Sequence, residues 1–433
     1  MRKFLTIMML TGVALAAPAA HPYEVYEVRV APESGAWTAS RGEKVSFGVT
    51  LENCNVPADG ELEYFISEDM MPARKSGHVK LRKGRATIDA GTMRAPGFLR
   101  CEAVYTGPDG RRYSGLGTIG FDPDSIVPAT ENPADFDTFW EETLRYAREC
   151  GLNSKMELLP GRCTPTVDVY RVSFSVFHRN SRIYGMLAVP RGKKTMPAVV
   201  MYPGAGVHVI GPAIDIAERC GAMTLSIGIH GIPVDLDPEV YRNLDWGALQ
   251  GYFMHKIHAR DQYYYKRVVA AAAVAVDFVA SLPECNGCIA AYGGSQGGFL
   301  AIASAALNPA VKMLAAHFPA LSDHAGYLKG RAGGWPAILR DEWNRTPAII
   351  NTLKYYDTVN FARRLSVPGF YTYGYNDLTC PPTSVCAAFN VITAPKKFFV
   401  VPTTMHYTFT EQYDWSLAEL ARELAECSGA VAR

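Results

Sequence analysis

The stretch AYGGSQGGFL, residues 291–300, restricts the fold more than any other part of the sequence. It overlaps a short apolar run, residues 288–292, that is typical of a strand, and it leads into residues 299–307, which are typical of an apolar helix. A strand, a Gly-x-Ser-x-Gly turn and a helix in this order predict a nucleophile elbow, a sharp turn that exposes one serine. The serine of this elbow would be Ser295.

Other interpretations of this glycine-rich stretch are a phosphate-binding loop and a plain structural turn. A phosphate loop ends in Gly-Lys-Ser/Thr, and a dinucleotide loop needs Gly-x-Gly-x-x-Gly with an acid ~20 residues later. Neither pattern is present. Gly293 and Gly297 lie two residues before and after Ser295, where strand and helix of an elbow cross too closely for a Cβ atom. We therefore favour the elbow.

Continuous apolar runs recur through the C-terminal part of the chain, separated by segments of helical length. They are residues 198–202, 223–229, 289–292, 313–316, 370–373 and 398–401. Such runs are typical of strands buried on both faces by helices, as in a parallel sheet. Together with the elbow, they predict an α/β-hydrolase fold, with a mostly parallel sheet covered by helices on both faces.

The chain between about residues 23 and 123 has a different pattern, with apolar residues at every second position. In KVSFGVTL, residues 44–51, four apolar side chains fall on one face. Several short strands over ~100 residues predict a small all-β sandwich of immunoglobulin-like type. The proline-rich segment 122–133 is typical of a linker. We therefore predict a β-sandwich domain over residues 20–124 and an α/β-hydrolase catalytic domain over residues 125–433.

The N-terminus has the pattern of a secretory signal peptide. Arg2 and Lys3 precede an apolar run that ends in small residues, with cleavage expected at Ala16 or Ala19. The run is shorter than the ~20 residues that a membrane-spanning helix needs. We therefore expect residues 1–19 to be removed, the protein to be secreted or periplasmic, and no membrane span.

Charge and cysteine content exclude several classes of function. With 43 basic and 42 acidic side chains, the chain lacks the positive charge of nucleic-acid-binding proteins, so we expect no nucleic-acid partner. Ten cysteines in 433 residues do not make a disulfide scaffold. Cys54 with Cys101 is one candidate bridge, and Cys285 with Cys288 is a close pair without further ligands at metal spacing. We expect no metal and no cofactor.

A serine hydroxyl needs a base to become a nucleophile, and the base needs an acid to orient it. In an α/β-hydrolase these groups follow in the order serine, acid, histidine. The histidines after Ser295 are His317, His324 and His406. The acids between Ser295 and His406 are Asp323, Asp341, Glu342, Asp357 and Asp377.

We predict Asp377 as the acid and His406 as the base. Each follows an apolar run, at the strand ends where α/β proteins build their sites. With Asp377 as the acid, His406 is the only downstream histidine. Asp323 is the competing acid, but it precedes the expected strand and more readily caps a helix or orders a loop.

An oxyanion hole needs two backbone N–H donors, one from the residue after the serine and one from an earlier strand-to-helix loop. The first donor would be Gln296, through its backbone N–H rather than its side chain. For the second we predict Ala205, in the loop that follows the run 198–202.

These residues resemble the acetyl xylan esterase and cephalosporin-C deacetylase family of α/β-hydrolases. The resemblance covers about residues 135–426 and is carried by FDTFW, DQYYYKRV, GGSQGG, HFPALSD and NDLTCPPTSVCAAFN. It implies deacetylation of acetylated xylo-oligosaccharides and similar small esters. It also implies that Ser295, Asp377 and His406 form the triad, with Ala205 and Gln296 as the oxyanion donors.

Three positions depart from the family pattern. Pro203-Gly204-Ala205 replaces His-Gly-Tyr, His230-Gly231-Ile232 replaces Arg-Gly-Gln, and Tyr407 replaces a glutamate after the histidine. His230 and Tyr407 are therefore candidate pocket residues. The N-terminal β-domain is additional to the family's minimal form, in which a homo-oligomer is usual.

The sequence thus predicts a secreted serine esterase acting on a small acetylated saccharide or polysaccharide, with a homo-oligomer as one candidate assembly. The alternative within catalysis is a peptidase or general carboxylesterase on the same fold, since a fold does not determine a substrate. The alternative outside catalysis is a carbohydrate-binding or scaffold protein.

Overall fold

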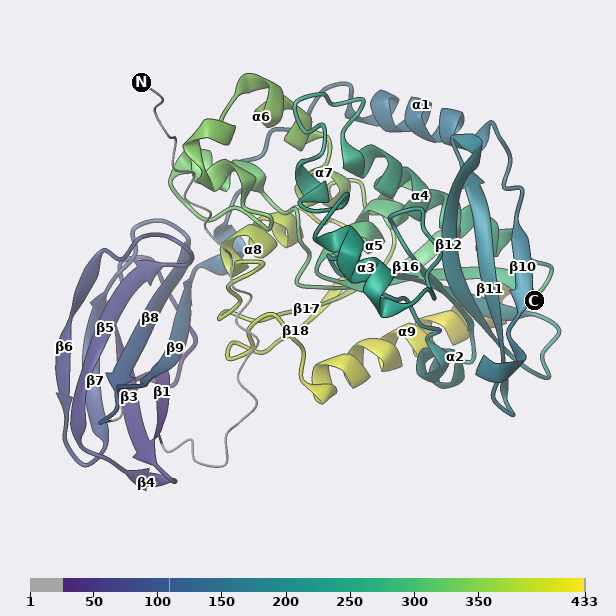
Figure 1. Cartoon of the computed structure of the whole chain (residues 1–433). Helices are drawn as coiled ribbons and strands as arrows, with labels where there is room; N and C mark the ends of the chain where they lie inside the picture. The colour runs from purple at the N-terminus through teal and green to yellow at the C-terminus, as the bar shows by residue number, and fades with distance from the viewer. Residues whose placement is uncertain (1–25, 109, 432–433) are drawn as a thin grey trace, which may run out of the picture.

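The computed structural model describes residues 26–108 and 110–431. The predicted signal peptide, residues 1–19, lies outside the described residues. Figure 1 shows two groups of elements side by side, strands β1 to β9 on the left and a helix-covered sheet on the right. Across the described ranges, no helix is both long enough and apolar enough to cross a membrane.

We call residues 26–121 the N-terminal β region. Its strands are β1 (Tyr26–Pro32), β2 (Thr38–Ala39), β3 (Val45–Asn53), β4 (Val56–Pro57), β5 (Gly60–Glu68), β6 (Lys75–Leu81), β7 (Arg85–Gly91), β8 (Gly97–Thr106) and β9 (Arg112–Phe121). One sheet has the order β1-β3-β4 with β7 also paired to β3, and the other has the order β2-β9-β8-β5-β6. The alternation in β3 buries Phe47, Val49 and Leu51 completely, in a core shared by both sheets.

The rest of the chain is built around a nine-stranded sheet, with the strand order β10-β11-β12-β14-β13-β15-β16-β17-β18. The strands are β10 (Lys155–Leu158), β11 (Val167–Val176), β12 (His178–Pro190), β13 (Met196–Tyr202), β14 (Met223–Ile227), β15 (Cys285–Gly294), β16 (Val311–His317), β17 (Gly369–Tyr373) and β18 (Lys396–Val400). Strands β13 to β18 pair in parallel, and β10, β11 and β12 extend one edge antiparallel. Each predicted apolar run falls on one of the parallel strands.

The α-helices are α1 (Phe136–Arg148), α2 (Ile214–Cys220), α3 (Pro238–Asp245), α4 (Tyr264–Ala280), α5 (Gln296–Leu307), α6 (Pro347–Lys354), α7 (Thr358–Ala362), α8 (Pro382–Asn390) and α9 (Thr410–Val431). Short 3₁₀ turns are η1 (Pro123–Ser125), η2 (Pro160–Arg162), η3 (Tyr252–Met254), η4 (His324–Lys329), η5 (Ile338–Arg340) and η6 (Glu342–Asn344).

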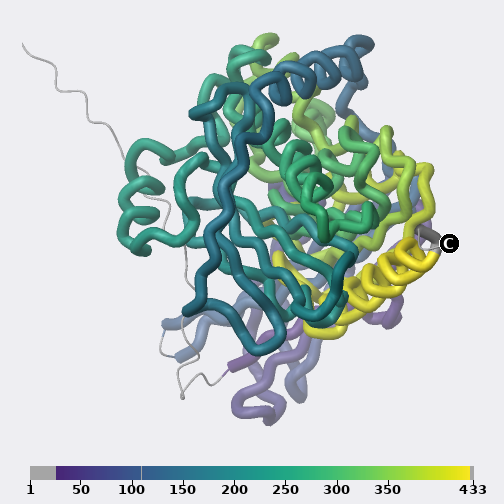
Figure 2. Tube along the Cα trace, turned by 90° about the vertical axis from the view of Figure 1, so that its right-hand side faces the viewer, coloured from purple at the N-terminus to yellow at the C-terminus, as the bar shows by residue number. Residues whose placement is uncertain are grey.

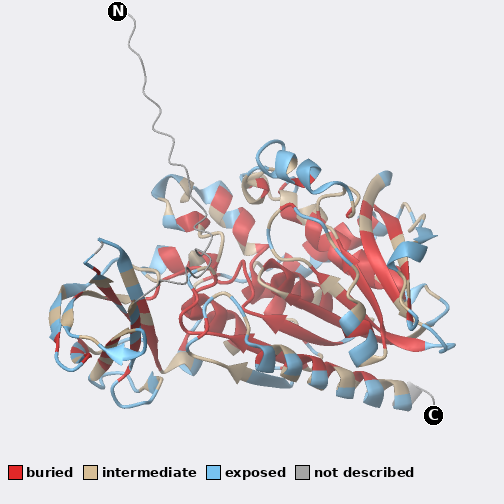
Figure 3. Cartoon of the chain, turned by 60° about the horizontal axis from the view of Figure 1, so that its bottom comes forward, coloured by how far each residue is buried: buried red, intermediate tan, exposed pale blue. Residues whose placement is uncertain are grey.

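Helices cover both faces of this sheet because its strands are apolar on both faces. In β13, Ala198 and Val200 pack in the core that contains α4 and α5, whereas Val199 packs with Leu417 and Leu420 of α9. Figure 2 shows β11 and β12 toward the viewer and α9, in yellow, along the side. In Figure 3, α9 alternates between exposed and buried colours, as its amphipathic pattern predicts. A mostly parallel sheet with helices on both faces is the architecture that the sequence predicts for this part of the chain.

The strand order places the site. The chain goes from β13 to β14 on one side, and then crosses to β15 on the other side of β13. Such a reversal leaves a crevice at the carboxyl ends of β13 and β15, and α/β proteins bind ligands in such a crevice. Ser295 follows β15, and the loop of residues 203–213 follows β13. We call residues 203–213 the oxyanion loop.

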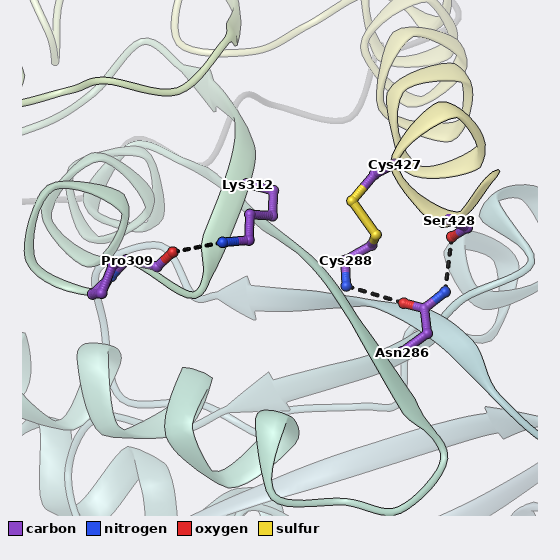
Figure 4. The surroundings of a disulfide bond; sticks show 6 residues. All are labelled: Asn286, Cys288, Pro309, Lys312, Cys427 and Ser428. Atoms are coloured by element: carbon purple, nitrogen blue, oxygen red, sulfur yellow. Dashed lines mark hydrogen bonds between the residues drawn. A yellow bond between two sulfur atoms is a disulfide. The ribbon is translucent and has the colours of Figure 1, made fainter. Parts of the chain in front are cut away.

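Neither of the two cysteine pairs that the sequence left open forms a disulfide. Cys288 of β15 is bonded instead to Cys427 of α9, with Cα atoms 5.9 Å apart (Figure 4). Cys288 lies on the sheet face that packs against α9, whereas Cys285 lies against the opposite core and stays free. Cys54 is exposed after β3 and Cys101 is buried on β8, so their thiols remain free as well.

Candidate active site

Ser295 stands on the turn between β15 and α5, with a backbone φ of 57° that side chains rarely adopt. The turn is held because Ser295 N–H donates to the carbonyl of His317, 3.0 Å away at the end of β16. A Cβ atom on Gly293 would lie 2.4 Å from the carbonyl carbon of Gly297, and one on Gly297 would lie 2.2 Å from the carbonyl oxygen of Tyr202. The two glycines are therefore required by close approach, as the elbow motif predicts.

The structure brings Ser295, His406 and Asp377 together in one hydrogen-bonded chain. Ser295 Oγ lies 3.0 Å from His406 Nε2, and His406 Nδ1 lies 2.8 Å from Asp377 Oδ2. Asp377 is completely buried, whereas the His406 side chain is 27% exposed. The histidine can therefore meet a molecule arriving from solvent while its carboxylate partner is shielded from water.

Asp377 is fixed by its own loop, residues 374–381, which we call the acid loop. Its Oδ1 accepts hydrogen bonds from the N–H groups of Thr379 at 2.7 Å and Cys380 at 2.8 Å. The carboxylate only accepts hydrogen bonds, so Nδ1 of His406 carries the proton that it shares with Asp377. Nε2 is then left as the acceptor for the Ser295 hydroxyl.

The acid loop is also bonded to the loop that carries His406, residues 401–409, which we call the histidine loop. Tyr375 N–H donates to Pro402 and Asn376 N–H donates to Thr404, each at 3.2 Å. Gly374 permits this approach, because a Cβ atom there would lie 2.1 Å from the carbonyl oxygen of Thr404. Base and acid therefore lie on two loops that are hydrogen-bonded to each other.

This arrangement can transfer a proton from the serine hydroxyl to the imidazole while the carboxylate stabilises the resulting imidazolium. It has the geometry that acyl transfer requires, with nucleophile to base and base to acid both within hydrogen-bond reach. Cys380 offers no competing nucleophile, because its burial raises the pKa of its thiol well above the usual range and keeps it protonated.

The predicted oxyanion donors lie on adjoining segments. Gln296 is the first residue of α5, so its backbone N–H has no acceptor within the helix. Within the described part of the chain, the N–H of Ala205 has no acceptor either, and Ala205 is exposed. Both donors are thus free to face a substrate oxygen.

The side chain of Gln296, which we expected to matter less than its backbone, joins these two segments. It is completely buried, and its Nε2 donates to Gly204 O at 3.1 Å in the oxyanion loop. Its Oε1 accepts the hydroxyl protons of Tyr252 and Tyr265, each at 2.7 Å. Burial raises the pKa of Tyr252 to about 12, so this hydroxyl remains a donor. No sequence pattern predicted this network, because its members lie on the oxyanion loop, η3, α4 and α5, which only the fold brings together.

His230 and Tyr407, the candidate pocket residues, have different surroundings. His230 Nε2 lies 3.0 Å from the carbonyl of Gly206, and its Nδ1 lies 2.7 Å from the hydroxyl of Tyr264. Burial lowers the pKa of His230, which favours a neutral ring. Through its Nε2 this ring contacts Gly206 of the oxyanion loop. Tyr407 is 46% exposed next to His406 and packs its ring on Phe409, so it borders the open side of the histidine.

The competing acid and the other histidines lie in different contacts. Asp323 accepts the N–H groups of Ala129 and Thr130, at 2.7 Å and 2.8 Å, and pairs with Arg331. It therefore orders the segment after the β region, as its loop position suggested. His317 and His324 are buried, and desolvation lowers the pKa of each to about 4. The imidazole that lies within hydrogen-bond reach of Ser295 Oγ is that of His406, whereas His317 meets Ser295 only through its backbone carbonyl.

Comparisons with known proteins agree on one family. The family model described as acetyl xylan esterase matches residues 125–419. The acetyl esterase Axe7A of Xylanibacter ruminicola is 37% identical over 414 residues, which are 94% of this chain and 93% of that relative. The match to this relative therefore includes most of the N-terminal β region as well.

Two solved structures share the fold of the C-terminal part. The acetyl xylan esterase from Paenibacillus sp. R4 is 24% identical, with a TM-score of 0.60 over 69% of this chain and 98% of that one. Acetyl xylan esterase 1 from Thermoanaerobacterium sp. JW/SL YS485 is 22% identical, with a TM-score of 0.60 over 70% and 97%. The chain belongs to the acetyl xylan esterase family and is a carboxylic ester hydrolase.

Proposed function

We propose that this protein is an exported serine esterase that removes acetyl groups from acetylated carbohydrate of the xylan or xylo-oligosaccharide type. The observation that carries the proposal is the hydrogen-bonded chain from Ser295 through His406 to the buried Asp377, in a member of this family. The names of the relatives support acetyl esters as the substrate class.

In the proposed mechanism, Ser295 Oγ attacks the ester carbonyl carbon while His406 Nε2 takes the hydroxyl proton. The negative charge on the carbonyl oxygen is held by the N–H groups of Gln296 and Ala205. Collapse of this intermediate breaks the bond to the sugar oxygen, which leaves with the proton from His406. Asp377 holds Nδ1–H throughout and stabilises the imidazolium.

The second half of the reaction regenerates the enzyme. Water donates a proton to His406 as its oxygen attacks the acetyl-serine carbonyl. Collapse of this second intermediate returns the proton to Ser295 Oγ and releases acetate. The residues that carry these steps are all supplied by the chain itself, so the mechanism routes no step through a metal or an organic cofactor.

The proposal also includes the parts of the chain outside the family model. We propose that residues 1–19 are a signal peptide, that residues 20–124 form an immunoglobulin-like β-sandwich domain, and that residues 125–433 form the catalytic domain. Support for the β-sandwich comes from the two mostly antiparallel sheets that share one core. Cleavage after the signal peptide is tested by N-terminal sequencing of the protein recovered from an expressing cell's periplasm or medium.

The test of function compares hydrolysis of p-nitrophenyl acetate, acetylated xylo-oligosaccharide and a peptide amide by the wild type and by Ser295→Ala. We expect acetate release from both esters, and a loss of at least ~10³-fold in kcat in the variant. The control is Ser304→Ala, which removes a buried serine hydroxyl from α5, the helix that follows Ser295, without touching the site.

Each other outcome points to a named alternative. Peptide cleavage without acetate release would favour a peptidase, and hydrolysis of longer acyl esters in preference to acetate would favour a general carboxylesterase. Binding of the oligosaccharide without hydrolysis of any ester would favour a carbohydrate-binding protein. Equal activity of Ser295→Ala and wild type would overturn the proposed mechanism.

A further inference from the structure

The acid loop is covered by the N-terminal β region, which lies outside the residues that the family model matches. In Figure 1, the start of β8 and the end of β9 lie beside α8, the helix that begins where the acid loop stops. Arg100 of β8 is only 5% exposed at this junction. Its Nη2 donates to the carbonyl of Tyr375 at 3.2 Å and to the carbonyl of Asp377 itself at 3.3 Å.

Arg100 is held in this position by the β region. Its Nε donates to Thr118 Oγ1 of β9 at 3.2 Å, and its Nη1 lies 3.5 Å from Met70 Sδ. Burial lowers the pKa of Arg100, and the charges of Asp69 and Asp377 oppose that shift. A buried guanidinium is costly unless its donors are used, so the two carbonyls of the acid loop are part of what makes this burial tolerable.

A second buried charge of the β region binds the start of α8, directly after the acid loop. Asp69 follows β5, is 2% exposed, and accepts Thr383 N–H at 3.1 Å and Thr383 Oγ1–H at 2.5 Å. Thr383 lies in the first turn of α8, so the carboxylate also meets the positive end of that helix. Burial raises the pKa of Asp69, while Arg100 and the Thr383 donors act in the opposite direction.

Uncharged contacts complete the junction. Asn376, the residue before Asp377, donates its side-chain N–H to Leu116 O of β9 at 3.0 Å. The ring of Tyr375 meets the ring of Phe98 edge to face, with centroids 4.9 Å apart. Three consecutive residues of the acid loop, 375–377, therefore each contact the β region directly.

We propose that Arg100, assisted by Asp69, is a positioning residue for Asp377, so that the β region takes part in setting the alignment of the catalytic centre. The inference rests on the proposed function of Ser295, Asp377 and His406. Arg100 donates a hydrogen bond to the carbonyl of Asp377, the residue whose carboxylate orients His406. A misplacement of about 1 Å in such a group can lower the rate by ~10²-fold. The backbone of Asp377 is thus anchored by Arg100, and its carboxylate by Thr379 and Cys380.

The test measures kcat and KM for p-nitrophenyl acetate in the full-length Arg100→Met, Arg100→Lys and Asp69→Asn proteins. We expect Arg100→Met to lower kcat by roughly 10- to 100-fold with KM changed less than about threefold, because the acid moves while the substrate pocket does not. Arg100→Lys, which keeps the charge and one set of donors, is expected to recover part of this loss. Asp69→Asn keeps its shape and is expected to lower kcat by less than Arg100→Met.

The matched control is Asn390→Ala, which removes a side chain that donates to Pro123 O and Ile126 O. These bonds also join α8 to the N-terminal half of the chain, but they do not touch the acid loop. We expect this variant to lower the melting temperature while leaving kcat within about threefold of wild type. A purely structural role for Arg100 would give the same pattern, and that result would overturn the inference.

A second measurement separates this inference from the proposed function. A fluorophosphonate reacts with an activated serine, whose Oγ displaces fluoride from phosphorus, so its labelling rate reports alignment at Ser295 without an ester substrate. Suppose that the wild type is labelled rapidly but hydrolyses none of the esters, and that Arg100→Met is labelled more slowly. That result would sustain the inference and overturn the proposed function. Hydrolysis that depends on Ser295 but not on Arg100 would do the reverse, and no labelling of the wild type would overturn both.

Discussion

The two loops that serve Ser295 are held by different parts of the molecule. The oxyanion loop is fastened within the α/β region by Gln296, the neighbour of the serine in sequence. The acid loop is fastened by Arg100 of the N-terminal β region, 277 residues before Asp377. One support therefore lies within the residues that the family model matches, and the other comes from a segment that precedes them.

The two supports also differ in chemistry. Around Gln296 all partners are neutral, with an amide, two tyrosine hydroxyls and backbone carbonyls. At the acid loop the partners are a buried guanidinium and a buried carboxylate, Arg100 and Asp69. Removing one partner of a neutral buried bond costs about 1–3 kcal/mol, whereas an uncompensated buried charge costs about 3–5 kcal/mol. Loss of a single partner should therefore lower the free energy of unfolding more at the support from the β region than at the support around Gln296.

The largest effect on kcat is expected at the acid itself. Asp377→Asn keeps the shape of the side chain but removes the charge that orients and stabilises the His406 ring, so we expect kcat to fall by about 10⁴-fold, as in other serine hydrolases. Steady-state kinetics with p-nitrophenyl acetate measure this. The matched control is Asp323→Asn, another buried carboxylate, which should lower stability and leave kcat nearly unchanged. A comparable loss in the control would make Asp323 the functional acid.

The next largest effect tests the neutral support. Gln296→Leu leaves the hydroxyls of Tyr252 and Tyr265 without their acceptor and frees Gly204, so we expect kcat to fall by about 10²- to 10³-fold through loss of oxyanion stabilisation. Tyr265→Phe keeps the amide bond to Gly204 and should cost less than about tenfold. Kinetics and thermal melting are measured together. If Tyr265→Phe were as damaging as Gln296→Leu, the fastening of the oxyanion loop would not be the reason for the loss.

Only a small coupling energy is expected between the two supports when both are removed together. Arg100→Met and Gln296→Leu belong to networks with no shared partner, so their effects on the activation free energy should add to within about 0.5 kcal/mol. A double-mutant cycle on kcat/KM gives this coupling directly. A coupling energy well above about 1 kcal/mol would mean that the two supports do not act independently on the catalytic centre.

No change in kcat is expected when a tether that touches neither loop is removed. Cys427→Ser breaks the bridge to Cys288, and closing a loop of this length is worth up to about 5 kcal/mol of unfolding free energy in the chain-entropy model. We therefore expect a lower midpoint in urea with kcat within about twofold of wild type. Cys220→Ser, which alters a thiol that is already free, is the control. A large loss of kcat in Cys427→Ser alone would show that the tether also aligns the site.

Local patterns were sufficient to predict much of this molecule. The six apolar runs correspond to the six parallel strands, and the elbow follows from glycines whose Cβ atoms would clash. Chain order was enough to select Asp377 and His406, which the structure places within hydrogen-bond reach. These features are local or follow from fixed topology, so a single sequence carries them.

The contacts that the sequence did not predict are those between distant segments. Arg100 lies in a strand whose pattern indicates only alternation, and nothing in its neighbours shows that its guanidinium reaches the acid loop. The bridge of Cys288 depends on which face of β15 meets α9, which no spacing between cysteines can reveal. The side chain of Gln296 was assigned a minor part because the motif specifies its backbone alone.

The bridge between Cys288 and Cys427 closes a covalent ring that contains Ser295, Asp377 and His406. A protease that cuts once at an exposed turn inside this ring, for example near the exposed Trp343, would leave both pieces joined through sulfur. Such a nicked molecule would migrate at full length until it is reduced and as two fragments afterwards. The ring would therefore keep Ser295 and His406 on one covalent molecule after a cut that would otherwise separate them.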